Sequence, residues 1–230
     1  MTGKRSLHRR GFTLVEMLVV IVLAGGLLTV MSFHIFTISQ TWLNRNQGLF
    51  LPNHADGVAF YLRETLAAAD AFADEDRLGE PEGVEELPSE ALQFALPPHW
   101  NGSPNRPLLA IYQYQTGPLL QVDERTSPEA QSYLYFDDQQ RQLSLIWFGM
   151  LQPEVRYERD LRTTLLSPYV RNVEYVYYEE DIDEWEVEDE PREEDGEFPL
   201  PRYLKLTFTL GEQITERYVP LPLSTRDPAY

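Results

Sequence analysis

A glycine, a phenylalanine and a glutamate near the N-terminus have types and spacing that would allow charge pairing if the chain were cut after the glycine. Gly11 and Phe12 follow Arg9 and Arg10, and Glu16 comes four residues after Phe12. A cut between Gly11 and Phe12 would leave a free amine on Phe12, with Glu16 one helical turn further along the same face. A carboxylate inside an apolar segment costs on the order of a few kcal/mol. The amine of a neighbouring subunit would neutralise Glu16 in that low-dielectric setting.

The segment that holds Glu16 has the length and composition of a membrane-spanning helix. Residues 12–36 are mostly apolar and carry only this one formal charge, and a spanning helix needs roughly 20 apolar residues. The run is too long for the core of a cleaved secretory signal peptide. Four basic residues precede it and only Arg45 follows closely. The positive-inside bias therefore predicts a single-pass protein with residues 1–11 in the cytoplasm.

A second helical stretch is expected beyond the membrane segment. Residues 37–72 continue the helical pattern, and Pro52 predicts a kink near that position. A stripe at helical spacing predicts the face that packs on a sheet. This stripe consists of Val58, Leu62, Leu66 and Ala69.

The remaining residues, 73–230, predict a β-rich head. Short alternating or apolar runs, bounded by proline, glycine or charge, are typical of strands. The expected strands are Leu92–Leu96, Leu108–Tyr114, Ser132–Phe136, Leu143–Phe148, Val170–Tyr178, Tyr203–Leu210 and Ile214–Val219. In the strand Tyr203–Leu210, apolar and polar residues alternate strictly. This alternation predicts an antiparallel sheet covered on one face.

The chain is strongly acidic, and the acids concentrate in one predicted loop. The net charge is −18, and removal of the four positive charges of residues 1–11 leaves −22. Residues 179–197 hold thirteen acids and one base, Arg192. Such a chain repels phosphate backbones, so direct nucleic-acid binding is not expected. Asp181, Asp183 and Glu186 are weak candidates for Ca²⁺ ligands, because the run lacks a defined ligand spacing and acidic runs are usually solvated.

Patterns typical of enzymes and cofactor sites are absent from the sequence. The four histidines, His8, His34, His54 and His99, are scattered, and no phosphate-binding loop or zinc pattern occurs. No cysteine is present, so no disulfide stabilises the fold. We therefore expect no enzymatic activity, and no cofactor apart from Ca²⁺ at the weak candidates.

The N-terminal residues resemble those of type IV pilins and type II secretion pseudopilins. The matching residues are Gly11, Phe12, Thr13, Leu14 and Glu16, followed by the apolar helix. The resemblance implies that a prepilin peptidase cuts between Gly11 and Phe12 and N-methylates Phe12, and that Glu16 guides filament assembly. It also implies an α+β, pilin-like lollipop fold, in which a long bent N-terminal helix packs on a globular head of antiparallel β-sheet.

The C-terminal third resembles the J-type minor pseudopilin. The order is a tyrosine-rich strand over Val170–Tyr178, then Trp185, an acidic stretch, the strand Tyr203–Leu210 and Tyr218-Val219-Pro220. The resemblance implies a periplasmic head and a place at the tip of an inner-membrane-anchored pseudopilus. The implied partners are I-type and K-type minor pseudopilins, the filament and the inner-membrane assembly platform. The implied function is export of folded proteins across the bacterial outer membrane.

Two alternatives remain open. One is a minor pilin that primes a type IV pilus used for adhesion, motility or DNA uptake. The other is a membrane-anchored receptor that binds calcium or another ligand.

Overall fold

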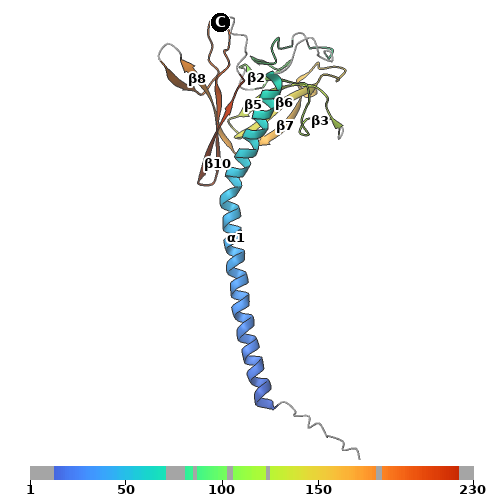
Figure 1. The fold of residues 1–230 in the computed structure, drawn as a ribbon. Helices are drawn as coiled ribbons and strands as arrows, with labels where there is room; N and C mark the ends of the chain where they lie inside the picture. The colour runs from blue at the N-terminus through green and yellow to red at the C-terminus, as the bar shows by residue number, and fades with distance from the viewer. Residues whose placement is uncertain are drawn as a thin grey trace, which may run out of the picture. The chain divides into compact units, whose positions relative to one another are not determined.

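The computed structural model describes residues 13–70, 81–84, 87–102, 106–122, 125–179 and 183–222. The chain divides into two compact units, one up to Phe50 and one from Leu51 onward. One helix, α1 (Leu14–Asp70), contributes to both. The described part of the second unit consists of antiparallel sheets around the last turns of α1 (Figure 1). The predicted α+β fold, a long apolar N-terminal helix followed by an antiparallel β head, is confirmed.

In the first unit, α1 is apolar on all sides. Its segment Leu14–Gln40 is long and apolar enough to cross a membrane, and its large apolar side chains are exposed around the whole helix. A helix of this kind is stable in lipid or among other apolar helices rather than in water. Two of its hydroxyls bond to its own backbone: Thr29 to the Gly25 carbonyl (2.8 Å) and Thr37 to the Phe33 carbonyl (2.9 Å). These bonds give each hydroxyl an acceptor within its own helix.

The second unit contains three antiparallel sheets among the described residues. The five-stranded sheet has the order β1 (Leu92–Ala95), β2 (Leu108–Gln113), β5 (Ala130–Asp137), β6 (Gln142–Gly149) and β7 (Arg162–Ser167). The four-stranded sheet has the order β11 (Gln213–Pro220), β10 (Tyr203–Leu210), β8 (Val170–Glu179) and β9 (Glu184–Glu188). Strands β3 (Gln121–Val122) and β4 (Arg125–Thr126) form a small ribbon, and a short 3-10 helix, η2 (Glu158–Asp160), precedes β7.

One hydrophobic core joins both larger sheets to the end of α1. The predicted helix stripe is buried, with Leu62 and Leu66 fully inaccessible, and it packs against residues from both sheets. The five-stranded sheet contributes Leu109, Leu145 and Trp147, among others. Its other face is also covered, because alternate residues of β2, β5 and β6 pack in a second cluster with Val155. Both larger sheets are therefore fixed to the same helix.

The strand β10 follows the predicted alternation over most of its length. Leu204, Leu206 and Phe208 are fully buried, whereas Leu210 is 39% exposed at the end of the strand. The polar residues of β10 lie on the opposite face, where Lys205 forms an ion pair with Glu174 of β8 (3.0 Å). Period-two patterning thus predicted the correct buried face.

The helix and some of the strands differ from the sequence-based expectation. The helix continues through Pro52 as one element instead of as two helical stretches. Leu51 and Ala55, on either side of the proline, are fully buried, so packing offsets the backbone hydrogen bond that proline cannot donate. The predicted acidic loop, residues 179–197, contains the strand β9, and β7 was not predicted. The bend near Pro52 stays a prediction.

His54 makes the stability of the head depend on pH. Its Nε2 lies 2.9 Å from Ser167 Oγ, and its ring packs edge-on against Tyr169 (5.2 Å between ring centres). Burial lowers the pKa of His54 below its ordinary value. The unfolded chain therefore takes up a proton near pH 6.5, whereas the folded head does so only at lower pH.

We expect the free energy of unfolding to fall as the pH falls from about 6.5 through the lowered pKa of His54. Above that window both states hold a neutral imidazole and the contribution vanishes. Denaturant titrations of the wild type and of His54→Gln between about pH 5 and 7.5 would measure the difference. Parallel pH profiles for the two proteins would contradict this assignment.

Candidate functional site

The first turn of α1 is closed by a reciprocal pair formed by Thr13 and Glu16. The Thr13 backbone N–H donates to Glu16 Oε2 over 2.8 Å, and the Thr13 hydroxyl lies 3.0 Å from the same oxygen. In return, the Glu16 backbone N–H donates to Thr13 Oγ1 over 3.3 Å. This arrangement is a capping box, which satisfies backbone donors that a helix start leaves free. It also fixes the direction of the Glu16 carboxylate.

The capping geometry leaves Glu16 able to accept a further donor. Both bonds from Thr13 end on Oε2, and within the described residues no hydrogen bond ends on Oε1. A carboxylate offers about four lone-pair sites. Glu16 can therefore cap its own helix start and at the same time accept a hydrogen bond from a positively charged group. The residue types had predicted only the second role of Glu16, the pairing, although the Thr-x-x-Glu spacing before an apolar run is a signature of the first, the capping.

The proposed cleavage site lies outside the described residues. Gly11 and Phe12 both precede Thr13, where the description of the chain begins. Cleavage between them and methylation of Phe12 stay predictions. Glu16 is placed at the surface of the apolar helix, and the next acid along α1 is Asp56, beyond the membrane-spanning length. Its isolation in an apolar segment makes a charged partner energetically important.

Arg192 organises the acidic hairpin of the head, which consists of β8, β9 and the acidic residues that follow β9 up to Glu197. Its guanidinium donates to Glu186 Oε2 over 2.6 Å and to Glu188 Oε1 over 2.7 Å, and it also bonds Glu179. The same group lies over the Tyr177 ring, 4.6 Å from its centre. The hydrogen bond to Glu179 raises the pKa of Arg192 above its already high value. The guanidinium therefore stays charged and links β8 to β9 through these carboxylates.

The weak calcium candidates do not come together around a common point in the described structure. Asp183 accepts a hydrogen bond from the Tyr178 hydroxyl, and Glu186 accepts one from Arg192. Asp181 lies outside the described residues. Among the residues with assigned positions, no group of three or more acids, histidines or cysteines is placed to hold a metal ion. Of the candidates that the structure describes, only Glu186 lies against Arg192, together with Glu179 and Glu188.

Replacing Arg192 by methionine should loosen the edge strand β9. The side chain is only 17% exposed, and a hydrogen bond to a charged group contributes about 1.5–3 kcal/mol. Partial rehydration of the freed carboxylates reduces the net loss to about 1–2 kcal/mol. Amide hydrogen exchange should show faster exchange in β9 with little change in β6. Arg159→Met, whose side chain is 79% exposed and lies 4.0 Å from Asp160, is the matched control, and equal β9 protection in both variants would contradict the assignment.

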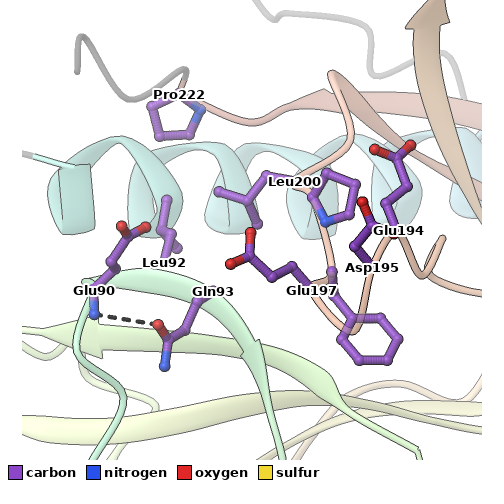
Figure 2. A pocket seen from close by; sticks show the side chains of 10 residues that line it. Glu90, Leu92, Gln93, Glu194, Asp195, Glu197, Leu200 and Pro222 are labelled. Carbon is purple, nitrogen blue, oxygen red and sulfur yellow. Dashed lines mark hydrogen bonds between the residues drawn. The ribbon is translucent and has the colours of Figure 1, made fainter. Parts of the chain in front are cut away.

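A shallow acidic pocket lies beside β1 in the head. It has a volume of about 480 Å³, and its lining includes Leu92 and Leu200. Figure 2 shows the carboxylates of Glu90, Glu194 and Glu197 around these apolar side chains. The lining supplies acceptors and apolar surface but no histidine, serine or lysine. The described lining of this pocket therefore presents carboxylates beside apolar surface.

The histidines of the head have structural contacts. His99 Nε2 lies 2.9 Å from the Gly83 carbonyl and 3.1 Å from the Val155 carbonyl, so it joins two loops. His54 packs inside the head against Ser167 and Tyr169. These contacts hold loops and core elements of the head together.

Comparison with known proteins identifies the N-terminal segment. Residues 7–32 match the family model described as the prokaryotic N-terminal methylation motif. The match covers the first turns of α1 with Thr13 and Glu16, together with the residues on either side of the expected cut. No curated protein matches the chain. The motif is that of a structural substrate of a processing peptidase rather than of an enzyme.

Proposed function

We propose that the chain is a minor pseudopilin of a type II secretion system. The proposal rests on the premise that this methylation motif and α+β fold are those of a type IV pilin-like protein. In this proposal a prepilin peptidase removes residues 1–11 and methylates Phe12. The mature subunit lies in the inner membrane with its head in the periplasm. It then joins I-type and K-type subunits at the tip of a filament that helps to export folded proteins.

The observation that carries the proposal is the first turn of α1. The methylation motif includes a capped helix start whose single carboxylate is fixed by Thr13 and can accept a second donor. The Phe12 amine of a neighbouring subunit has the charge to pair with Glu16 in an apolar setting. One such pair for each subunit would set the axial position of each helix in the filament.

The apolar surface of α1 supports transfer from lipid into a filament. Side chains from Leu14 to Ile38 are exposed around the helix. Lipid tails and neighbouring apolar helices are similar environments, so packing and polar pairing decide whether the helices associate. A subunit can thus leave the membrane without exposing this surface to water. The Glu16 pair would then favour the filament over the membrane.

The J-type assignment depends on the order of elements in the C-terminal third. A tyrosine-rich strand, an acidic hairpin and a final antiparallel pair follow one another as β8, β9, β10 and β11. The same N-terminal motif would serve a minor pilin of a type IV pilus. The net charge of −22 after leader removal disfavours direct contact with DNA in either case.

Affinity isolation of the tagged full chain from detergent-solubilised envelopes tests the proposal. Co-isolation of I-type and K-type minor pseudopilins, identified by mass spectrometry, is the expected result. Glu16→Ala is the matched control for partners that depend on helix pairing. Recovery of pilus minor subunits instead would replace the secretion assignment by the pilus assignment, and recovery of no filament protein would favour the receptor alternative.

A further inference from the structure

The strand β9 is an unpaired edge with two chemically different faces. It pairs with β8 on one side, and within the described part of the chain no strand pairs with its other side. Trp185 and Val187 point to one face and are 53% and 52% exposed. Glu184, Glu186 and Glu188 alternate with them and point to the other face. Such an edge can accept a further strand through its backbone.

The apolar face of this edge continues into the sheet. The Trp185 ring lies 4.9 Å from the Tyr178 ring and 5.6 Å from the Tyr203 ring. Val176 lies opposite both Val187 and Tyr203 in the strand register. An added strand would therefore place alternate side chains beside an existing aromatic and aliphatic row, where cross-strand pairs are stabilising.

The acidic face determines the charge of the partner. Arg192 is the one cation among the described residues of the hairpin that forms ion pairs with Glu179, Glu186 and Glu188. Since a single guanidinium faces several carboxylates, the face keeps a net negative charge. A second copy of this chain would bring glutamates against glutamates, and directly opposed like charges are destabilising. The edge therefore resists self-pairing and favours a basic strand.

We propose that the free edge of β9 binds an extended segment of another polypeptide in which lysine or arginine alternates with apolar residues. The basic side chains lie beside Glu184, Glu186 and Glu188, and the apolar ones beside Trp185 and Val187. The backbone of the segment extends the four-stranded sheet by one strand. This inference goes beyond the proposed function, because it does not depend on which filament the chain joins.

A labelled peptide of about seven residues with alternating arginine and valine provides the test, since this length spans a typical strand. Fluorescence anisotropy would follow its binding to the full chain in non-ionic detergent micelles at about 0.15 M salt, where distant surface charges are largely screened. We expect saturable binding, no binding of a glutamate–valine peptide, and binding at least roughly tenfold weaker when every peptide nitrogen is N-methylated. N-methylation keeps the charge and removes the backbone donors that a strand needs.

Two charge-reversal variants locate the site. Glu184→Lys should weaken binding by roughly threefold to tenfold, because it places like charges opposite one another. Glu212→Lys, an exposed change in the turn between β10 and β11, should leave the affinity unchanged. The inference would be overturned if the methylated and unmodified peptides bound with equal affinity, or if the two variants weakened binding equally. It would also be overturned if the peptide bound empty micelles equally well or did not bind the chain at all.

Discussion

Glu16→Ala should reduce the amount of this chain in sheared filaments by at least roughly tenfold while its insertion into the membrane is retained. An unpaired charge in an apolar environment costs several kcal/mol, and removal of Glu16 would leave the neighbouring Phe12 amine in that position. Membrane insertion depends on the apolar length of α1, which the change does not shorten. Quantitative immunodetection in the filament and membrane fractions measures both quantities.

A second variant separates charge pairing from helix capping. Glu16→Gln keeps a side-chain oxygen that can accept the Thr13 N–H, since glutamine also serves in capping boxes, but it removes the charge. If the ion pair drives assembly, the incorporation of Glu16→Gln into filaments should fall as much as that of Glu16→Ala. Thr29→Val is the control within the same helix, because the Thr29 hydroxyl bonds its own backbone. Normal incorporation of Glu16→Gln would contradict the charge-pairing account.

Phe208→Ala should destabilise the head by about 3–5 kcal/mol, the range for removing a buried aromatic side chain. Phe208 is fully buried in the core shared by α1 and both larger sheets, and its ring lies 6.4 Å from that of His54. The cavity would therefore weaken the contacts among three elements at once. Denaturant unfolding of the full chain in micelles, followed by tryptophan fluorescence, gives the change in the free energy of unfolding.

Leu210→Ala is the matched control for that measurement. Leu210 lies two residues further along β10 on the same side of the strand, but it is 39% exposed. Its loss should cost no more than about 1 kcal/mol, since less buried apolar surface is removed. Equal destabilisation by the two variants would show that Phe208 is not part of the common core.

The fold was predictable wherever burial imposes a simple period on the sequence. The helix stripe with Leu62 and Leu66 and the alternation of Leu204, Leu206 and Phe208 both lie in the core as expected. Strand β7 escaped prediction because, among its residues, only Ser167 is fully buried and no alternation of apolar and polar types marks it. Strand β9 escaped because its glutamates resemble a solvated loop, although Trp185 and Val187 alternate with them.

The sequence indicated which residues make up the candidate site and only part of their geometry. The resemblance carried by Gly11, Phe12 and Glu16 implied cleavage and pairing, and the methylation motif covers these residues, while cleavage and pairing stay predictions. The capping bond from Thr13 follows from a local four-residue spacing that the sequence already contains. The contact between Arg192 and Glu179, thirteen residues apart, could not be predicted, because it depends on the register of β8 and β9.

Intact-mass spectrometry of the chain purified from cells with and without a prepilin peptidase tests the central claim most directly. With the peptidase, the mass should be that of a chain beginning at Phe12 with one methyl group on its amine. Without the peptidase, or in a variant with a residue bulkier than glycine at position 11, the uncut 230-residue chain should remain. An uncut wild-type chain in the presence of an active peptidase would contradict the assignment as a pilin-like subunit.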